Sequence, residues 1–477
     1  MLPQKEIIGD DTVEVGKIEF DSRLIGEGDL FVALVGANLD GHDYISDVAS
    51  RKAACVVVER DIQADIPAKV VVPDTRHALA LLAAKYFDYP SHHMKLLGVT
   101  GTNGKTTVAY LVQSILNQRG RKAGLIGTVE YLVGDKRFDA PNTTPESLQL
   151  EKLLSLMRAE RTRFAVMEVS SHALHAGRIR MIEFAAVGIT NLTQDHLDFH
   201  GSMDEYKKTK ALLFDKVHGK DKWAILNMDD GEFDFFRKHV DSSYLTYSVN
   251  GKKADIRAAD IDVSVSGSRF KMMTPLGSET IQLRLSGEHN ISNALCAAAF
   301  AMAVGQSPTA IRKGLEAVAT VPGRLEAVEN DRGITIFVDY AHTPDALDNV
   351  CSVCRKLTDK NLVVLFGCGG DRDKTKRVPM AQAVCRFADK IVVTSDNPRG
   401  EDPQAIIDDM KPGLDSSIPA EENTDRREAI GAAIEMCSEG DVLLVAGKGH
   451  ESYMNIGGRK IRFDDREVIK EVLDGLR

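Results

Sequence analysis

Hydrophobic and polar positions follow two rhythms along the chain, and the change between them indicates separate structural parts. In the first ninety residues, short apolar runs such as IEFDSR, GDLFVAL, AACVVVE and KVVVP are separated by turns and polar segments. Runs of this length and composition are typical of strands. From Lys95 onward, short apolar strands alternate with longer segments of helical period. This second rhythm predicts a mostly parallel sheet covered by helices on both faces.

The second part carries the clearest pattern. Residues 95–100 form a short apolar strand, and residues 105–120 then place apolar side chains at helical spacing before a stop at Gly120. Further strands are predicted at residues 163–169, 185–192 and 222–227. The irregular stretch from Gly251 to Leu285 predicts an antiparallel insertion or edge.

Two short segments mark domain boundaries, one around Pro90 and one at Val321-Pro322-Gly323-Arg324. After the second boundary, ITIFVDY, NLVVLFG, DKIVVTSD and DVLLVAG predict a smaller α/β unit. We therefore predict an α/β protein of three domains. They are a smaller N-terminal α/β domain at 1–92, a central domain with a doubly wound, mostly parallel sheet at 93–324, and a C-terminal Rossmann-like domain at 325–477.

The composition is that of an ordinary globular protein, with 43% hydrophobic and 27% charged residues. A net charge of −10 argues against bulk electrostatic binding to nucleic acid or to an anionic membrane. No apolar run approaches the roughly 18 residues of a membrane span, and Ala294–Val304 is predicted to be a buried helix. The N-terminal residues do not resemble a signal peptide.

Seven cysteines are scattered along the chain, and only Cys351 and Cys354 form a C-x-x-C pair. A zinc or redox site there needs further ligands nearby, so we interpret the pair as two ordinary thiols on a helix. Cysteine usage of this kind favours a reducing compartment, the cytoplasm. We expect a monomer.

The strongest chemical signal is the segment from Gly98 to Thr107, GVTGTNGKTT, between a predicted strand and a predicted helix. Glycines in such a loop let backbone N–H groups surround phosphate oxygens, and Lys105 adds a positive charge. Thr106 offers a hydroxyl group to Mg²⁺, and the helix N-terminus favours an anion. Val99 stands where the strict pattern has glycine, so this is a variant phosphate loop. The sequence predicts nucleotide binding here.

Four further residues admit both a functional and a structural interpretation. Glu168 and His196 each follow a predicted strand of the same sheet, so a metal role at one cleft is favoured over a helix cap and a core histidine. Asp339 after ITIFVDY suits a ribose, a metal or a helix cap, and these readings stay open. Arg324 is either an exposed residue or an arginine that reaches a phosphate between two domains. Spacing alone places Lys210 on the surface.

Charged clusters follow three strands of the C-terminal part, at Gly367–Arg377, Ser395–Gly400 and Ala446–Ser452. Arginine forks pair well with carboxylates, whereas Glu451 and Asp396 suit an ammonium group. Together they favour an amino-acid-like ligand, although charged loops are commonly just solvated.

The motifs TGTNGKTT, MEVSSHAL, TNLTQDHLDFHG, GEHNISNAL, VPGRLE and VDYAHTPDAL occur in this order, and the chain resembles the Mur ligases of peptidoglycan synthesis over nearly its whole length. Within that family, DSRLIGEGDLFVAL, NTTPES, GCGGDRDKTKR, DNPR and AGKGHE resemble the members that add the third residue of the stem peptide. The DNPR motif, residues 396–399, is similar to the diaminopimelate-adding type rather than the lysine-adding type.

This resemblance implies an ATP- and Mg²⁺-dependent amide ligase. Its substrates would be UDP-N-acetylmuramoyl-L-alanyl-D-glutamate and meso-diaminopimelate, and the reaction would proceed through an acyl phosphate. It implies catalytic roles for Lys105, Lys210 and His342, and a carbamylated side chain at Lys210. The implied ATP contacts are Gly101, Thr102, Asn103, Gly104, Lys105, Thr106, Thr107, Asn290, Arg324 and Asp339. The implied metal ligands are Thr106, Glu168, His196 and Lys210.

The resemblance also implies two sets of substrate contacts. Those for the UDP-muramoyl dipeptide are Ser22, Asn142, Thr143, Thr144, Ser170 and Arg178. Those for diaminopimelate are Arg372, Asp396, Asn397, Pro398, Arg399, Gly447 and Glu451. One departure is Ala176, since some relatives carry a glutamine two residues before Arg178.

Other functions compete with this interpretation. The nearest is a sister amide ligase, such as a folylpolyglutamate synthetase or the next Mur enzyme, against which the DNPR motif and the DSR…GDLFVAL opening argue. A P-loop switch without ligation would leave the C-terminal charged clusters without a purpose, and the chain has no N-K-x-D guanine motif. A kinase-like phosphotransferase would instead release a phosphorylated product.

Overall fold

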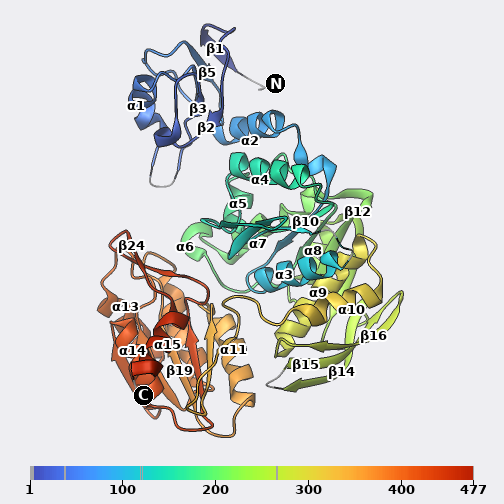
Figure 1. The fold of residues 1–477 in the computed structure, drawn as a ribbon, viewed down its shortest axis with the longest axis vertical. Coiled ribbons are helices and arrows are strands. Elements are labelled where there is room, and N and C mark those ends of the chain that lie inside the picture. Colours follow the sequence, from blue (N-terminus) through green and yellow to red (C-terminus); the bar gives the residue numbers. More distant parts are fainter. Residues whose placement is uncertain (1–4, 37–38, 119, 121, 265–266, 476–477) are drawn as a thin grey trace.

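The computed structural model describes residues 5–36, 39–118, 120, 122–264 and 267–475. Three sheets, each with its own helices, follow one another along the chain (Figure 1). We call the three parts the N-terminal unit (residues 6–93), the central unit (95–317) and the C-terminal unit (326–475). Residues 1–4, which open the segment where no signal peptide is expected, lie outside the described ranges.

The N-terminal unit has a five-stranded sheet in the order β1-β5-β4-β3-β2, in which only β1 pairs antiparallel. Its elements are β1 (Glu6–Gly9), β2 (Ile18–Glu19), η1 (Ser22–Leu24), β3 (Leu30–Val32), η2 (Gly41–Tyr44), α1 (Ile45–Ser50), β4 (Cys55–Val58), β5 (Ala68–Val71), α2 (Thr75–Tyr86) and η3 (Pro90–His93). The predicted strand IEFDSR is mostly wrong. Only Ile18 and Glu19 pair, because Asp21 accepts a hydrogen bond from the Arg23 backbone and starts the turn η1.

The central unit has an eleven-stranded sheet in the order β16-β15-β14-β13-β12-β11-β6-β10-β7-β8-β9. The strands are β6 (Lys95–Thr100), β7 (Gly124–Ile126), β8 (Glu130–Val133), β9 (Lys136–Asp139), β10 (Phe164–Glu168), β11 (Ala186–Ile189), β12 (His218–Asn227), β13 (Asp241–Ser248), β14 (Ile256–Ser264), β15 (Gly267–Thr274) and β16 (Gly277–Leu283). The strands from β7 to β14 in this order run parallel, whereas β14, β15 and β16 pair antiparallel. The antiparallel edge predicted for the stretch from Gly251 to Leu285 is therefore confirmed.

The helices of this unit are α3 (Lys105–Asn117), α4 (Ser147–Ala159), α5 (Ser171–His175), α6 (Leu197–His200), α7 (Met203–Ala211), η4 (Phe214–Lys216), α8 (Phe233–Lys238), α9 (Glu288–Ala303) and α10 (Pro308–Ala317). One apolar core joins α3, α9 and α10 to the sheet, and a second joins α4 and η4 to it. Small alanine side chains let α9 lie close to the sheet, and Ala294–Ala301 are fully buried. The covered sheet and the buried helix are thus both confirmed.

The C-terminal unit has a six-stranded sheet in the order β17-β18-β22-β19-β20-β21, parallel except for β17. Its elements are β17 (Glu326–Val328), β18 (Thr335–Asp339), α11 (Pro344–Lys356), β19 (Leu362–Phe366), η5 (Lys374–Lys376), α12 (Arg377–Cys385), β20 (Lys390–Thr394), α13 (Pro403–Met410), η6 (Lys411–Gly413), β21 (Ala420–Asn423), α14 (Arg426–Glu435), β22 (Val442–Ala446), β23 (Tyr453–Ile456), β24 (Arg459–Arg462) and α15 (Asp465–Gly475). Cys351 and Cys354 are buried free thiols on α11, as expected.

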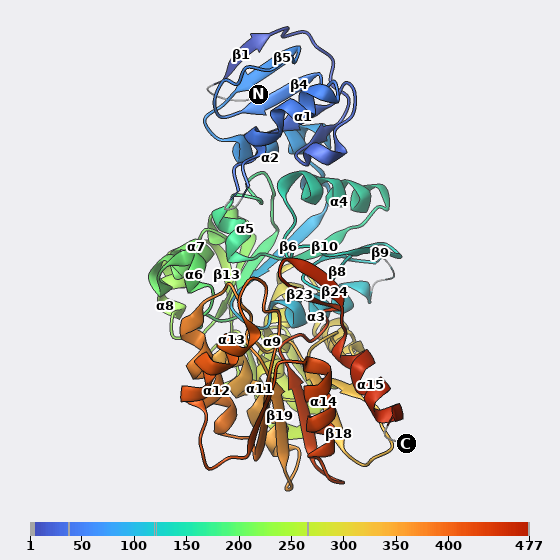
Figure 2. The ribbon, with the colours of Figure 1, turned by 90° about the vertical axis from the view of Figure 1, so that its left-hand side faces the viewer.

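The N-terminal unit lies at one end of the long axis, beyond the central unit, and the C-terminal unit lies beside the lower part of the central unit (Figure 1 and Figure 2). Arg76 of α2 donates a 2.8 Å hydrogen bond to Glu146, which joins the N-terminal unit to the central unit. Asn103 of the loop after β6 donates a 2.8 Å hydrogen bond to Asp345 of α11, which joins the central unit to the C-terminal unit. Within the described ranges, none of the helices is long and apolar enough to cross a membrane.

Candidate functional site

The loop between β6 and α3 is shaped by two glycines with positive φ angles, 142° at Gly101 and 84° at Gly104. A side chain at either position would also collide with a neighbour. A Cβ atom at Gly104 would lie 2.3 Å from the Asn293 Oδ1, and one at Gly101 would lie 1.8 Å from the Thr190 Oγ1. Only glycine fits both the angles and the space, so this is a loop in which the backbone turns directly into the N-terminus of α3.

Lys105 lies over this loop rather than in solvent. Its Nζ donates hydrogen bonds to the carbonyl oxygens of Gly101 (3.0 Å) and Thr102 (2.9 Å). Burial lowers the pKa of this ammonium group. A half-buried amine bound only to carbonyls gains from an anionic ligand, which fits the predicted phosphate site.

Thr106 and Glu168 converge beside the loop. The Thr106 hydroxyl donates a 3.0 Å hydrogen bond to Glu168, whose carboxylate also accepts from the backbone N–H (2.8 Å) and the hydroxyl (2.9 Å) of Thr128. Arg324 donates a 3.2 Å hydrogen bond to the Thr106 oxygen from the segment that leads into the C-terminal unit. The prediction that places Arg324 between two units and near the phosphates is consistent with this contact.

A cavity of about 150 Å³ lies between the central and C-terminal units, beside the phosphate loop. Its lining includes six of the residues implied to contact ATP, namely Asn103, Gly104, Thr107, Asn290, Arg324 and Asp339. The Asp339 carboxylate accepts backbone hydrogen bonds from Leu325 and Ala341, both at 2.7 Å, and burial raises its pKa. His289 and Asp345 also line this cavity, although the sequence analysis singled out neither.

Lys210 is buried, with 1% of its surface exposed, so the surface position expected from spacing is wrong. Its Nζ donates a 2.8 Å hydrogen bond to the Gly101 carbonyl and lies 4.4 Å from the centre of the Tyr206 ring. Burial and the nearby charge of Lys105 hold the pKa of Lys210 well below its usual range. Spacing could not reveal this because the burial depends on how α7 packs against the phosphate loop.

His196 occupies a left-handed backbone conformation, with φ of 55°, just before α6. Its Nε2 lies 3.2 Å from the Asp195 carboxylate, and its ring centre lies 4.7 Å from that of His172. Burial lowers the pKa of His196 to about 3, so the ring is neutral at neutral pH. A neutral imidazole is the form that binds metal ions.

The donors near the loop suit Mg²⁺, which prefers oxygen ligands and keeps waters and substrate phosphates in its shell. The Thr106 hydroxyl and the Glu168 carboxylate already meet there at 3.0 Å. Among the described residues, no three histidine, cysteine or acidic side chains meet closely enough to hold a metal by themselves. A site in this protein would therefore depend on the nucleotide's phosphates as well as on these side chains.

A second cavity, of about 180 Å³, opens at the carboxyl ends of the C-terminal strands. It is lined by Arg372, Asp396, Asn397, Arg399, Gly447 and Glu451, which are six of the seven residues implied to bind diaminopimelate, and Pro398 lies in the same loop. Asp195 and His196 of the central unit line it too, together with His342. The His342 Nδ1 lies 2.7 Å from the Tyr340 carbonyl, and burial lowers the pKa of its ring.

The side chains of this cavity are held by one another. Asn397 donates 2.8 Å hydrogen bonds to both Asp396 and Glu451. Lys448, which is fully buried, donates a 3.0 Å hydrogen bond to Glu451. Arg399 donates to the carbonyls of Gly370 (2.8 Å) and Asn397 (3.4 Å). The carboxylates of Asp396 and Glu451 and the guanidinium groups of Arg372 and Arg399 thus line one small cavity, where a zwitterion can pair with groups of either charge.

The residues implied to bind the UDP-muramoyl dipeptide fall in two places. Thr144 accepts a backbone hydrogen bond from Ser170 (3.0 Å), and Arg178 donates to the Thr144 carbonyl (2.9 Å). The hydroxyl oxygens of Thr143 and Thr128 lie 3.1 Å apart, and the Asn142 carbonyl accepts a hydrogen bond from the Tyr131 hydroxyl. Ser22 is in η1 of the N-terminal unit, apart from this group.

Sequence reasoning missed several residues that the fold brings to these sites. Thr128 orients Glu168, Lys448 holds Glu451, and Asp195 and Lys376 meet beside His196. Lys376 and Lys448 stand in charged loops that the sequence did single out, but neither spacing nor composition marks which lysine points inward. Thr128 had no sequence signal because its role depends on the neighbouring strand β10.

Comparison with protein families gives three matches along the chain. Residues 99–301 match the Mur ligase middle domain, residues 323–449 match the Mur ligase glutamate ligase domain, and residues 14–87 match the Mur ligase family catalytic domain.

Individual relatives match over nearly the full length. The UDP-N-acetylmuramoyl-L-alanyl-D-glutamate--2,6-diaminopimelate ligase of Geobacillus kaustophilus is 44% identical over 96% of this chain and 94% of its own. A solved structure of an enzyme with the same name is 32% identical, with a TM-score of 0.66 over 97% of this chain and 95% of that one. The D-alanyl-D-alanyl ligase structure from Acinetobacter baumannii is 26% identical, with a TM-score of 0.67 over 91% and 90%.

Proposed function

The chain belongs to the Mur ligase family, and from that premise we propose that it joins meso-diaminopimelate to UDP-N-acetylmuramoyl-L-alanyl-D-glutamate with the energy of ATP. One observation carries the proposal. The nucleotide cavity and the cavity with paired carboxylates and arginines both lie on the junction of the central and C-terminal units, and both units line each of them.

The chemistry requires activation, because a carboxylate is a poor electrophile and its oxygen is a poor leaving group. The substrate carboxylate attacks the γ-phosphorus of ATP, which gives an acyl phosphate and ADP. The amine then attacks the acyl carbon, and phosphate departs with the former carboxylate oxygen. Lys105 and the Gly101–Gly104 loop hold the phosphates in place for the first step, and Arg324 adds charge from the other side. Substrates on separate units must meet, so positioning is a large part of the rate.

Thr106, Glu168 and His196 would hold Mg²⁺, which offsets phosphate charge when it is bound. The geometry supports this assignment because the Thr106 and Glu168 oxygens converge beside the phosphate loop. The lowered pKa of His196 keeps the ring available as a donor.

Lys210 would act as a carbamate. A neutral amine attacks carbon dioxide, an N–C bond forms and one proton leaves to water, so the side chain ends in an anionic group. Burial and the absence of any described acidic partner within ion-pair distance favour the neutral amine at Lys210. The resulting carboxylate would face Lys105 and the metal ligands.

The C-terminal cavity would bind diaminopimelate. Asp396 and Glu451 suit an ammonium group, and Arg399 and Arg372 suit carboxylates. Arg399 would pair with the carboxylate that lysine lacks, so lysine would leave a half-buried guanidinium without its partner.

Ser22, Asn142, Thr143, Thr144, Ser170 and Arg178 would hold the UDP-muramoyl dipeptide between the N-terminal and central units. His342 would take part in catalysis at the junction of the central and C-terminal units, where it lines the second cavity. Because one chain carries both cavities, a monomer would suffice. We place the reaction in the cytoplasm, as a step of peptidoglycan synthesis that supports cell shape and division.

The test is to incubate the enzyme with ATP, Mg²⁺, the UDP-muramoyl dipeptide and either diaminopimelate or lysine, and to weigh the products by mass spectrometry. We expect a tripeptide product with diaminopimelate, formed together with ADP and phosphate, and little product with lysine. A product with another amino acid alone would point to a sister ligase, and a phosphorylated product alone would point to a kinase. ATP hydrolysis without any joined product would contradict the proposal.

A further inference from the structure

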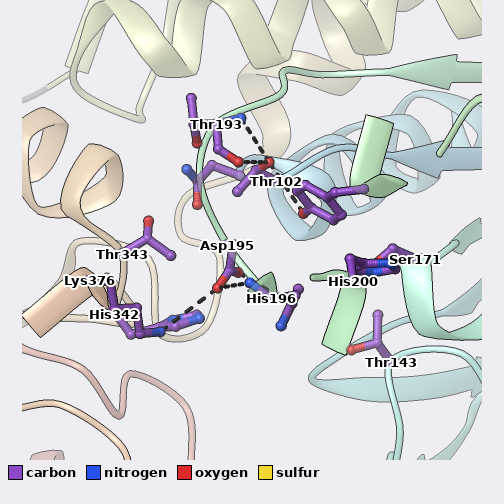
Figure 3. A network of polar contacts seen from close by, with 12 residues as sticks. Thr102, Thr143, Ser171, Thr193, Asp195, His196, His200, His342, Thr343 and Lys376 are labelled. Atoms are coloured by element: carbon purple, nitrogen blue, oxygen red, sulfur yellow. Dashed lines mark hydrogen bonds and ion pairs between the residues drawn. The ribbon is translucent and has the colours of Figure 1, made fainter. Parts of the chain in front are cut away.

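A lysine of the C-terminal unit reaches across the junction into the central unit. Lys376 ends η5, and its side chain is 7% exposed. Its Nζ lies 3.8 Å from the Asp195 carboxylate, and it lines the same cavity as His196 and Arg372. Figure 3 shows Lys376 and His342 on one side of Asp195 and His196 on the other.

Asp195 in turn holds His196 at two points. Its carboxylate accepts a 2.9 Å hydrogen bond from the His196 backbone N–H and lies 3.2 Å from the ring Nε2. His196 has the left-handed φ of 55°, which a residue with a side chain adopts only when its surroundings enforce it. The carboxylate between Lys376 and His196 therefore helps to set where the imidazole points.

The backbone around Lys376 is docked at the same place. Gln194 donates a 3.0 Å hydrogen bond to the Thr375 hydroxyl and a 3.4 Å hydrogen bond to Asp373. Asp373 also accepts hydrogen bonds from the backbone and the hydroxyl of Thr375, which fixes the start of η5. Residues 194–196 of the central unit and residues 373–376 of the C-terminal unit thus form one continuous patch of contacts.

We propose that Lys376 is a positioning residue, which couples docking of the C-terminal unit to the orientation of His196 through Asp195. The inference rests on the proposed function and adds to it a reason for the order of events. If the C-terminal unit swings away, the buried Asp195 carboxylate loses the ammonium group of Lys376, which helps to fix its position. His196 is then released from the orientation that the metal site uses, so the first phosphoryl step waits until the amino-acid cavity is in place.

The experiment compares Lys376→Met with Lys374→Met, a matched change two residues away. Lys374 is 64% exposed and pairs with Glu401 outside the cavity. Loss of a residue that orients a metal ligand typically costs about 10–100-fold in metal affinity or activity. We expect Lys376→Met to lose about that much kcat and to weaken Mn²⁺ binding, measured by electron paramagnetic resonance with a nonhydrolysable ATP analogue. Lys374→Met should change either quantity by less than about twofold.

Two further variants separate coupling from damage to the fold. Lys376→Arg keeps the charge and should recover much of the lost Mn²⁺ affinity. Asp195→Asn should weaken Mn²⁺ binding as well. The double variant Asp195→Asn/Lys376→Met should bind Mn²⁺ no more weakly than the single variant with the lower affinity, because both substitutions act through one path. The proposal is overturned if Lys376→Met binds Mn²⁺ as the wild type does, or if the two losses multiply.

The outcome is distinguishable from failure of the proposed function. The Mn²⁺ measurement needs only the nucleotide analogue, so it stands whether or not the wild type joins diaminopimelate. A wild type that forms no peptide, together with Mn²⁺ binding that depends on Lys376, would reject the proposed substrates and keep the coupling.

Discussion

The central and C-terminal units both bury cations, but they satisfy them in opposite ways. In the central unit, Lys105 and Lys210 donate only to backbone carbonyls. In the described part of the chain, no carboxylate lies within ion-pair distance of either, and burial lowers the pKa of both. Lys210 is buried and Lys105 is half-buried, and neither has the charged partner that would offset its desolvation.

In the C-terminal unit, Arg426 is fully buried and fully partnered. It makes 2.8 and 2.7 Å hydrogen bonds to Asp465 and donates 3.0 Å hydrogen bonds to the carbonyls of Ser395 and Ala446. Those carbonyls stand at the ends of β20 and β22, directly before Asp396 and Gly447 of the amino-acid cavity. The comparison teaches that unpartnered buried cations are reserved for ligands, whereas partnered ones hold the loops that carry ligand contacts.

The largest effect is expected at Lys210. Lys210→Ala removes the group that would carry the carbamate, and loss of a charge that stabilises a phosphoryl transition state costs about 10³-fold or more in kcat. Short carboxylic acids should restore part of the rate by filling the space with a carboxylate. The control is Lys208→Ala, an exposed lysine of the same helix that pairs with Asp204. Full activity of unrescued Lys210→Ala, measured as phosphate release, would contradict a ligand role.

Arg426, the partnered cation of the C-terminal unit, should affect the stability of the fold instead. Arg426→Met leaves Asp465 buried without its partner, which typically costs about 3–5 kcal/mol of unfolding free energy. Urea unfolding of the whole chain should show this loss in the transition of the C-terminal unit. The adjacent Arg427→Met removes an exposed pair with Glu471 and should cost less than about 1 kcal/mol. Equal losses of unfolding free energy in Arg426→Met and Arg427→Met would contradict the structural role assigned to Arg426.

Arg399 sharpens the comparison, because it is a cation of the C-terminal unit that donates only to carbonyls. By the same reasoning it belongs to the ligand. Arg399→Ala should raise the KM of diaminopimelate about 10- to 100-fold, since a lost charge-assisted hydrogen bond to a buried group costs about 1–3 kcal/mol. The KM of ATP should stay nearly unchanged. Arg459→Ala on the exposed strand β24 is the control, and equal loss for both ligands would reject the assignment.

The smallest effect concerns acid stability. Burial opposes ionisation of Glu401, but hydrogen bonds from Lys374, the Asp371 backbone and Arg377 outweigh it and lower the pKa of Glu401 to about 2. A lowered acid pKa stabilises the fold above the unfolded-state value near 4.5, and this contribution is lost as pH falls toward 2. Glu401→Gln should therefore flatten the pH dependence of unfolding between about pH 4.5 and 2. An unchanged slope of the unfolding free energy against pH would show that the hydrogen bonds of Glu401 contribute nothing to acid stability.

Local pattern predicted much of the fold, the phosphate loop, and the three charged loops whose residues line the second cavity. The phosphate loop could be found because its glycines, Lys105 and Thr106 are consecutive, and the strand before it and helix after it have clear periodicity. The hairpin β23–β24 was missed, although Gly457 and Gly458 between the runs YMNI and RKIR are a turn signal. All four residues of β24 are exposed, so no apolar alternation marks it.

Long-range burial could not be predicted. Lys210 has the sequence surroundings of a surface lysine, and its position under the phosphate loop follows from the packing of α7 against residues more than a hundred positions away. The same holds for Lys376, whose neighbour Lys374 is exposed. Which of two similar lysines enters a cavity depends on the docking of two units, and that information is spread over both.

The most direct measurement uses the UDP-muramoyl dipeptide with ¹⁸O at both oxygens of the glutamate carboxylate that forms the amide. The enzyme is supplied with ATP, Mg²⁺ and diaminopimelate, and the released phosphate is analysed by mass spectrometry. If ATP activates that carboxylate as an acyl phosphate, each phosphate released with a new amide bond carries one ¹⁸O atom. Unlabelled phosphate released alongside the tripeptide would contradict this account.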